Sequence, residues 1–393
     1  MKTAVLIILD GMGVGDAPDA EAYGDVGTNT FVNMSRVTGG VNIPTLESLG
    51  IGNIAPIEAV DQVSNPRASY GRLEEISMGK DSTTGHWELM GVVTEKAFPT
   101  YPDGFPEDVL AEFTARTGYG VIGNKAASGT EIIKELGEAH LNSGKLIVYT
   151  SADSVFQIAA HDSVCSLEEL YRVCEISREL LAGEHNVSRV IARPFTGAIG
   201  HFERTPYRKD YSVSPPTSLL LNQLTDSGVQ VESIGKIYDL YNGMGIDKSY
   251  VSKSNAEGMD MLMSVYNQPA EQDRLLLLNL VDFDMLWGHR NDPHGMKQGL
   301  EIFDQWLAGF LEQMREGDTV YMTADHGNDP TGTSTDHSRE HVPIIVYTQG
   351  QESGANLGVR KGFMDVGASL ADYFSVRYQG PGRSFYTELN QVH

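Results

Sequence analysis

Seven stretches of this chain are apolar at nearly every position, and this pattern constrains the fold more than any other feature. A strand with one exposed face alternates apolar and polar residues, whereas a strand covered on both faces does not. The pattern is therefore typical of a parallel sheet with helices on both sides. The stretches are Thr3–Leu9, Lys145–Thr150, Arg189–Phe195, Val229–Lys236, Leu275–Val281, Thr319–Thr323 and Val342–Tyr347.

Helical patterns lie between these stretches. The clearest extends from about Met296 to Arg315, where apolar residues recur at helical spacing, and Gly317 is expected to end it. A second helix is expected over about Leu167–Leu181. Strands that alternate with helices predict an α/β fold with a mostly parallel sheet.

Two Pro- and Gly-rich segments, near Phe98–Phe105 and Ser212–Pro216, are the expected crossings between domains. We expect residues 98–216 to form an inserted, smaller α/β domain. Residues 1–97 and 217–393 would then form one discontinuous core domain.

Charge excludes two classes of partner. The 393 residues include 29 Lys and Arg against 53 Asp and Glu, which gives a net charge of −24. Nucleic acid and anionic membrane both need a basic surface, so neither is expected as the main partner. A small anionic substrate needs only a local basic cluster. Cys165 and Cys174 are too few for a disulfide scaffold, and no signal peptide or membrane-spanning run is visible, so we expect a cytoplasmic protein.

Three of the expected strands lead directly into aspartate. Asp10 follows the first strand, Asp284 follows Leu275–Val281 closely, and Asp325 follows Thr319–Thr323. The carboxyl ends of parallel strands meet at one edge of a sheet, where ligands bind. Three carboxylates at that edge repel one another unless they are solvated or a multivalent cation binds them. Each aspartate taken alone is also consistent with an ordinary turn or helix cap.

Histidines accompany these aspartates. His289 follows Asp284, His326 follows Asp325, and His337 lies further along the chain. Mixed carboxylate and imidazole ligands suit Mn²⁺, Zn²⁺ or Fe²⁺. The six candidate ligands are too many for one catalytic ion and suit a two-metal site with a separation of about 3.5–4 Å.

A hydroxyl-rich segment could supply a nucleophile for such a centre. Gly79–Glu88 contains Thr84 at an expected turn before a helix, where backbone N–H groups favour an anion. A bound metal would lower the pKa of the Thr84 hydroxyl enough to activate it. An ordinary Ser/Thr-rich helix cap is the alternative interpretation.

Together these motifs resemble the phosphopentomutases of the alkaline phosphatase superfamily. The metal motifs alone would indicate only the superfamily, and the middle segment carries the narrower assignment. The matching segments are residues 10–20, 79–88, 122–131, 149–154, 190–195, 204–208, 279–284 and 323–329.

The resemblance implies a fold, a reaction and cofactors. The fold is an alkaline-phosphatase-like core with an inserted cap that binds sugar phosphate. The reaction interconverts ribose 1-phosphate and ribose 5-phosphate, and the 2-deoxyribose pair, by way of a phosphothreonine at Thr84. It needs two Mn²⁺ ions, or other divalent ions, and a sugar bisphosphate such as glucose 1,6-bisphosphate as activator. By motif, Asp10, Asp325 and His326 would hold one metal, and Asp284, His289 and His337 the other.

Substrate-binding residues are expected mainly in the middle segment. Arg189, Ile191 and Arg193 share one face of their strand by its period of two. With them, Arg208 and its basic neighbours suggest a phosphate-binding cluster, although a solvated basic loop is the alternative. Further candidates for contacts to sugar hydroxyls or phosphate are Ser151, Asp153 and Lys236.

Four positions depart from the family pattern: Gly11, Ala126, Tyr207 and Lys209. None is a candidate metal ligand, and the last two bear on the preferred sugar rather than on the reaction. A metal-dependent phosphatase or phosphodiesterase, a mutase for another sugar phosphate, a phosphoglycerate mutase and a non-catalytic metal-binding protein are alternative functions. The preferred sugar, native metal and oligomeric state are left open by the sequence.

Overall fold

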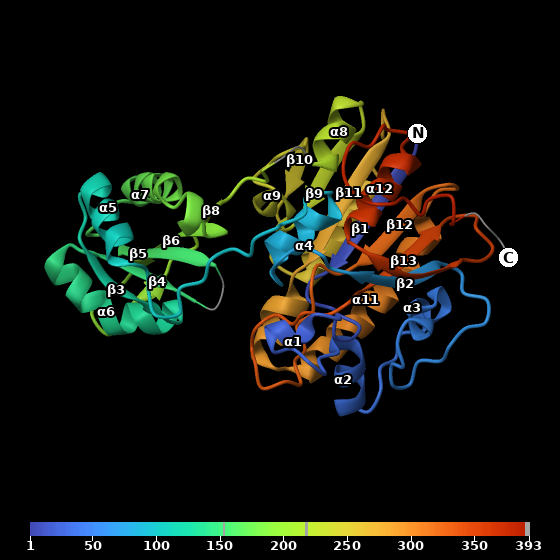
Figure 1. Cartoon of the computed structure of the whole chain (residues 1–393), viewed down its shortest axis with the longest axis horizontal. Coiled ribbons are helices and arrows are strands. Elements are labelled where there is room, and N and C mark those ends of the chain that lie inside the picture. The colour runs from blue at the N-terminus through green and yellow to red at the C-terminus, as the bar shows by residue number, and fades with distance from the viewer. Residues whose placement is uncertain (152–153, 217–218, 390–393) are drawn as a thin grey trace. The chain divides into compact units, whose positions relative to one another are not determined.

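The computed structural model describes residues 1–151, 154–216 and 219–389. The chain divides into two compact units, one of Met1–Lys96 with Pro215–His393 and one of Ala97–Ser214 (Figure 1). The expected boundaries, after residues 97 and 216, lie one and two residues from these. Among the described residues, no helix combines the length and the apolar character needed to cross a membrane.

The larger unit is built on an eight-stranded sheet with the order β10-β9-β11-β1-β12-β13-β2-β14. Its central strands are parallel and buried along their whole length. The strands are β1 (Thr3–Leu9), β2 (Ser69–Glu74), β9 (Gln230–Ile234), β10 (Lys248–Tyr250), β11 (Arg274–Leu280), β12 (Thr319–Thr323), β13 (Val342–Thr348) and β14 (Asn356–Lys361).

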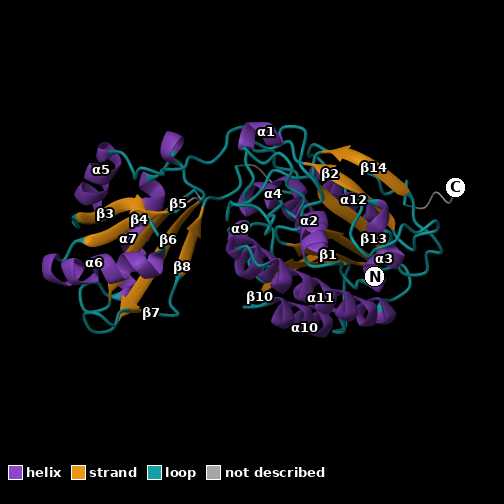
Figure 2. Cartoon of the chain, turned by 90° about the horizontal axis from the view of Figure 1, so that it is seen from below, coloured by secondary structure: helices purple, strands orange, loops and turns teal. Residues whose placement is uncertain are grey.

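Helices cover both faces of this sheet, which explains why its central strands are apolar throughout. Helix α12 packs against α4 and α8, while α10 and α11 lie on the other face (Figure 2). The helices are α1 (Ala20–Tyr23), α2 (Thr30–Val37), α3 (Pro44–Leu49), α4 (Ser82–Leu89), α8 (Leu220–Asp226), α9 (Ile237–Leu240), α10 (Asn255–Tyr266), α11 (Pro293–Gln313) and α12 (Met364–Tyr373).

The smaller unit has its own sheet, in the order β3-β4-β5-β6-β7, with β8 also paired to β6. One face packs on α5 and α7 and the other on α6, so each face has its own hydrophobic cluster. The elements are α5 (Glu107–Thr117), β3 (Val121–Ala126), α6 (Gly129–Ser143), β4 (Leu146–Thr150), β5 (Val155–His161), α7 (Leu167–Leu180), β6 (Arg189–Thr196), β7 (Glu203–Arg204) and β8 (Lys209–Ser212).

All seven expected strands are present, and each begins and ends within two residues of its predicted limits. Strand β13 differs in direction, because it runs antiparallel to both β12 and β2. A strand buried on both faces is apolar in either direction, so the pattern could not show this. Helix α11 ends at Gln313 rather than near Gly317. Strands β2, β3, β5, β7, β8, β10 and β14 were not predicted.

Candidate metal centre

Three adjacent parallel strands bring the expected ligands together. In the register of β11, β1 and β12, Leu9 pairs with Leu280, and Ile8 with Thr323. Asp10, Asp284 and Asp325 therefore emerge at the same edge of the sheet. All three aspartates are at least 96% buried, since none exposes more than 4% of its surface.

Two groups of ligand atoms form there. One comprises Asp10, Asp325 and His326, and the other Asp284, His326 and His337; within each group the ligand atoms lie within 4.8 Å of one another. His289 completes the set, because its Nε2 lies 3.3 Å from Asp284 Oδ2 and 3.2 Å from His337 Nε2. The six sequence-predicted ligands thus lie in one cluster, with His326 shared by both groups; His289 is half-buried and the other five are buried.

The carboxylates and imidazoles of the cluster shift one another's pKa values. Burial opposes ionisation of Asp284, but His337 and His289 outweigh burial and hold the pKa of Asp284 well below its usual range. Burial likewise opposes ionisation of Asp325, yet His326 and His86 lower its pKa to about 2. Burial disfavours the imidazolium of His326, whereas Asp325 and Asp10 raise its pKa well above the ordinary value. The site therefore holds carboxylates that need positive charge beside them.

Several details fit divalent cations. The buried oxygens Asp10 Oδ1 and Asp325 Oδ2 accept no hydrogen bond from the described residues. His289 Nδ1 donates to Thr335 O at 2.6 Å, and His326 Nδ1 donates to Gly327 O at 3.0 Å. Because each Nδ1 is a donor, each Nε2 is directed toward the carboxylates, as in metal-ligating histidines. Oxygen and nitrogen donors of this kind suit Mn²⁺, Zn²⁺ or Fe²⁺.

Two asparagines orient the carboxylates and were missed from the sequence. Asn279 Nδ2 donates to Asp10 Oδ2 at 3.0 Å, and Asn328 Nδ2 donates to Asp284 Oδ1 at 2.7 Å. Asn279 is a polar residue near the end of an otherwise apolar strand, and this polar position could have indicated a contact with the site. Asn328 lies in the loop after His326, where the sequence pattern carries no comparable signal.

The expected nucleophile lies in the first turn of α4. Asp81 caps this helix, since its Oδ1 accepts the Thr84 N–H at 3.1 Å and its Oδ2 accepts the Thr84 hydroxyl at 2.6 Å. Thr84 is fully buried. Its neighbour Ser82 is half-buried, and Ser82 Oγ lies 3.1 Å from His326 Nε2.

Gly85 allows α4 to approach the candidate metal ligands closely. A Cβ at this position would lie 2.0 Å from the backbone oxygen of Asp325, so only glycine fits. His86, one residue further, is also fully buried, and its Nδ1 lies 3.1 Å from Asp325 Oδ2. The single Nδ1 hydrogen is used by Ser82 O, at 2.8 Å. Helix α4 is therefore in direct contact with the ligand cluster, and His86 is a further residue that sequence reasoning missed.

The other candidates lie mainly in the smaller unit. Arg189 and Arg193 are half-buried on β6, and Ile191 between them is buried. Arg193 Nε donates to Gln157 Oε1 at 3.2 Å, and Arg208 forms two hydrogen bonds of 2.6 Å to Asp210.

Three further candidates for substrate contacts lie in different parts of the chain. Ser151 directly follows β4, and Asp153 is outside the described residues. Lys236 was expected to end a strand, but β9 ends at Ile234, and Lys236 instead begins the turn into α9 in the larger unit.

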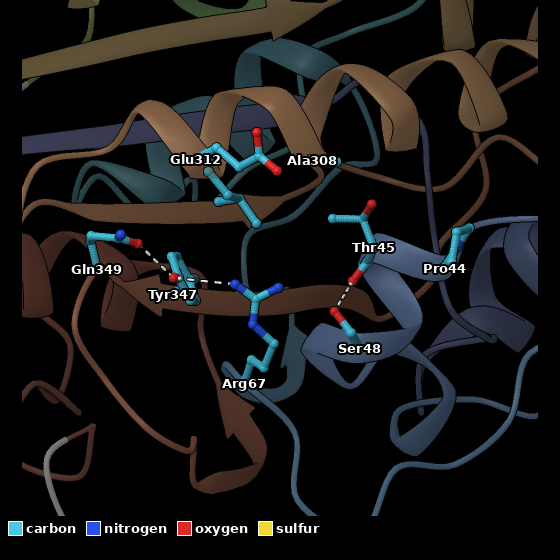
Figure 3. Close-up of a pocket in the computed structure, with 9 residues that line it drawn as sticks. Pro44, Thr45, Ser48, Arg67, Ala308, Glu312, Tyr347 and Gln349 are labelled. Atoms are coloured by element: carbon cyan, nitrogen blue, oxygen red, sulfur yellow. Dashed lines mark hydrogen bonds between the residues drawn. The ribbon is translucent and has the colours of Figure 1, made fainter.

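A surface cavity of about 410 Å³ lies at the opposite end of the larger sheet (Figure 3). Tyr347 on its wall pairs with Val320 near the start of β12, whereas Asp325 follows the end of that strand. Arg67 Nη2 in this cavity donates to the Tyr347 hydroxyl at 3.3 Å. None of the residues lining the cavity is a candidate ligand.

The chain is similar to known proteins in both sequence and fold. Residues 2–378 match the family model described as the Metalloenzyme superfamily, and the chain belongs to that superfamily. The PH0037 protein of Pyrococcus horikoshii shares the fold, with a TM-score of 0.51 and 14% identity over 97% of this chain and 99% of that chain.

Within the superfamily, the chain belongs to the phosphopentomutase family. It is 51% identical to the phosphopentomutase of Desulfitobacterium hafniense over 389 residues, which are 99% of this chain and 100% of that protein. It is 50% identical to the phosphopentomutase of Dictyoglomus thermophilum over 391 residues, 100% of this chain and 99% of that protein. The expected family and the alkaline-phosphatase-like fold class are confirmed, and the chain is a metal-dependent isomerase.

Proposed function

We propose that this chain interconverts ribose 1-phosphate and ribose 5-phosphate, and the 2-deoxyribose equivalents, through a phosphothreonine at Thr84. Family membership supports the reaction. The observation that carries the role of Thr84 is its position, fully buried at the start of a helix that Gly85 holds against Asp325. Because Gly85, the next residue, lies against Asp325, the helical turn that carries Thr84 is in contact with the ligand cluster, as phosphoryl transfer to and from a small sugar phosphate would need.

The ligand cluster would hold two divalent cations. Asp10, Asp325 and His326 are proposed for one, and Asp284, His289 and His337 for the other, with Mn²⁺ as the first candidate metal and other divalent ions as alternatives. When bound, the ions supply positive charge that lowers the pKa of a hydroxyl nucleophile and neutralises the charge of the transferred phosphoryl group. The orphaned oxygens of Asp10 and Asp325 support this assignment.

Asp81 has the geometry to move the Thr84 proton. When phospho-Thr84 gives its phosphoryl group to a sugar phosphate, the Thr84 Oγ–P bond breaks and a sugar O–P bond forms. The reverse step regenerates phospho-Thr84 from the other phosphoryl group of the bisphosphate. The accepting sugar hydroxyl loses a proton in the first step and Thr84 gains one, and the reverse step returns it. Asp81 Oδ2, which is 2.6 Å from the Thr84 hydroxyl, can accept or return the proton on the Thr84 side. A sugar bisphosphate such as glucose 1,6-bisphosphate would prime the cycle.

The smaller unit, Ala97–Ser214, is proposed as the cap that binds the sugar phosphate. Ser151, Asp153, Arg189, Ile191, Arg193 and Arg208 are its candidate contacts, and Lys236 is a candidate contact from the core. Arginine forks match phosphate oxygens, and Arg189, Arg193 and Arg208 are basic residues in a strongly acidic chain.

A phosphatase with the same core is the alternative, and product analysis separates the two. The Mn²⁺-loaded protein is incubated with ribose 1-phosphate and catalytic glucose 1,6-bisphosphate, and the products are quantified by ³¹P NMR. We expect ribose 5-phosphate without equivalent release of inorganic phosphate. Inorganic phosphate as the dominant product would contradict the proposal.

A further inference from the structure

Arg339 is a buried arginine in the larger unit that the proposed reaction does not use. It follows the candidate ligand His337 by two residues and exposes only 2% of its surface. All five of its N–H groups have acceptors: Nε and Nη2 donate to the Asp19 carboxylate, Nη2 also donates to Glu75 O, and Nη1 donates to Glu75 Oε2 and Gly79 O. A buried charge that is paired so completely holds the segments around it in one arrangement.

Tyr23, at the end of α1, binds the same glycine. Its hydroxyl accepts the Gly79 N–H at 3.2 Å, while Arg339 Nη1 donates to Gly79 O at 2.7 Å. The guanidinium carbon of Arg339 lies 5.0 Å from the centroid of the Tyr23 ring, so the two side chains also form a cation–π contact. Both backbone polar groups of Gly79 are therefore bound by one pair of side chains that contact each other.

Gly79 lies beside the proposed nucleophile. A Cβ built on this residue would lie 3.0 Å from Thr84 Oγ1 and 3.2 Å from Asp81 Oδ2, the oxygen that accepts the Thr84 hydroxyl. The φ of 148° at Gly79 is a conformation that glycine permits but does not fix. The hydrogen bonds to Arg339 and Tyr23 therefore hold this backbone beside the Thr84 hydroxyl.

Lys80 ties the next residue of the loop to the segment that contains Arg339. The Nζ atom of Lys80 lies 3.0 Å from Asp25 Oδ2, and the same oxygen accepts the backbone N–H of Arg339 at 2.8 Å. The loop that leads to Thr84 is thus joined at two consecutive residues to the segment that carries His337. A displacement of either segment would be passed to the other.

We propose that Arg339 and Tyr23 are positioning residues for phosphoryl transfer. By holding the Gly79 backbone, they restrict where the Thr84 hydroxyl and its proton acceptor can lie. Both act through Gly79 rather than on the reacting atoms, and a misplacement of about 1 Å at such a site can lower the rate about 100-fold. The proposal rests on the proposed function, because it requires that Thr84 carry the phosphoryl group.

Tyr23→Phe tests the proposal, because it removes the acceptor of the Gly79 N–H and keeps the ring beside Arg339. The Mn²⁺-loaded full-length chain is phosphorylated with glucose 1,6-bisphosphate, desalted and mixed with ribose 5-phosphate. Loss of phosphate from Thr84 is followed by quenched flow and mass spectrometry. We expect the transfer rate to fall about fivefold or more, while Mn²⁺ content and the KM for ribose 5-phosphate stay unchanged.

Hydrogen–deuterium exchange gives a second readout that does not depend on turnover. The Gly79 amide should exchange about fivefold faster in Tyr23→Phe, the equivalent of one hydrogen bond, measured by mass spectrometry of peptides that cover it. Tyr347→Phe is the matched control, because Arg67 lies 5.2 Å from the centroid of the Tyr347 ring and the Tyr347 hydroxyl is also hydrogen-bonded, at the opposite end of the sheet. This control should keep the wild-type exchange and transfer rates.

Arg339→Lys tests the arginine itself, since lysine keeps a positive charge beside Glu75 but has fewer N–H donors, in a different geometry. We expect its transfer rate to fall at least as far as that of Tyr23→Phe. Because Arg339→Lys also weakens a buried ion pair, the outcome for Tyr23→Phe carries more weight.

A wild-type transfer rate in Tyr23→Phe would overturn the proposal, and so would an unchanged exchange rate of the Gly79 amide. A wild-type chain that carries no phosphate on Thr84 would contradict the proposed function instead. The exchange rates would then still show whether Tyr23 holds Gly79 in place.

Discussion

The Thr84 hydroxyl donates to Asp81 Oδ2 at 2.6 Å, and the Thr84 N–H donates to the other oxygen of the same carboxylate at 3.1 Å. One side chain thus caps helix α4 and also holds the proton of the proposed nucleophile. The two tasks can be separated, because an asparagine at position 81 retains one oxygen for the cap but replaces the second by an amide nitrogen.

We therefore predict that Asp81→Asn lowers kcat about 100-fold or more, the range typical of losing a proton acceptor. KM and Mn²⁺ content should change little, since the cap is retained. Steady-state kinetics with ribose 1-phosphate, together with metal analysis, measure these quantities. Wild-type kcat in Asp81→Asn would show that Asp81 is only a cap.

Gly85→Ala should separate α4 from the ligand cluster. The added Cβ would lie 2.0 Å from Asp325 O, so the helix must shift. Overpacking of this kind costs about 1–3 kcal/mol, and we expect that loss in chemical denaturation together with loss of phosphothreonine formation. Gly309→Ala in α11 is the matched control, because nothing lies within 4 Å of its Cβ position. That variant should be as stable as the wild type or more stable by up to about 1 kcal/mol.

Asn328 offers a test of how the carboxylates are oriented. Its Nδ2 donates to Asp284 Oδ1 at 2.7 Å, and residues that orient a metal ligand typically change metal affinity about 10–100-fold. We predict that the wild type binds two Mn²⁺ per chain. In Asn328→Ala, the affinity for one of these two ions should fall about 10–100-fold. Mn²⁺ titration followed by electron paramagnetic resonance measures both ions. Asn267→Ala, which removes an exposed amide paired with Gln313, is the control. Unchanged affinity for both ions in Asn328→Ala would contradict the prediction.

Glu340 predicts a pH dependence of stability. Burial raises its pKa from 4.5 to about 7, although the hydroxyls of Ser338 and Thr30 and the Thr30 N–H oppose the shift. The folded state therefore retains this proton when the unfolded state has lost it, and stability falls as pH rises from about 4.5 to 7. The shift of about 2.5 pKa units corresponds to a loss of about 3 kcal/mol, complete above pH 7.

Urea denaturation of the wild type and of Glu340→Gln between pH 4.5 and 8 checks this prediction. The variant has no ionisable group at position 340, so the difference between the two proteins isolates the contribution of Glu340. We expect the wild type to lose stability relative to the variant as pH rises. A difference that is constant across this range would mean that Glu340 is ionised throughout.

Much of the central architecture could be predicted because burial on both faces makes each strand recognisable by itself. Strands β1 and β12 match their predicted limits, and both lead into aspartates that are candidate metal ligands. Strands such as β2, whose side chains alternate between buried and half-buried, and the three-residue β10 carry a weaker signal. The direction of β13 depends on its neighbours and has no local signature.

In the candidate site, too, residues marked by a local pattern could be predicted and residues defined by distant contacts could not. Asp10 and Asp325 could be placed because each directly follows a recognisable strand. Asn328 and His86 depend on contacts between segments distant in sequence, such as the 2.7 Å hydrogen bond from Asn328 to Asp284. Lys236 was placed at the end of a strand, but β9 ends at Ile234, and Gly235, with a φ of 85°, turns the chain toward α9.

Locating the phosphoryl group on the enzyme tests the central claim most directly. The Mn²⁺-loaded full-length chain is incubated with glucose 1,6-bisphosphate, digested and sequenced by mass spectrometry, alongside Thr84→Ala and Ser82→Ala. Ser82 is the matched control because its hydroxyl lies 3.1 Å from His326 Nε2. We predict phosphate on Thr84 in the wild type and in Ser82→Ala, and no phosphoenzyme or isomerisation in Thr84→Ala. Phosphate on Ser82, or isomerisation by Thr84→Ala, would contradict the account.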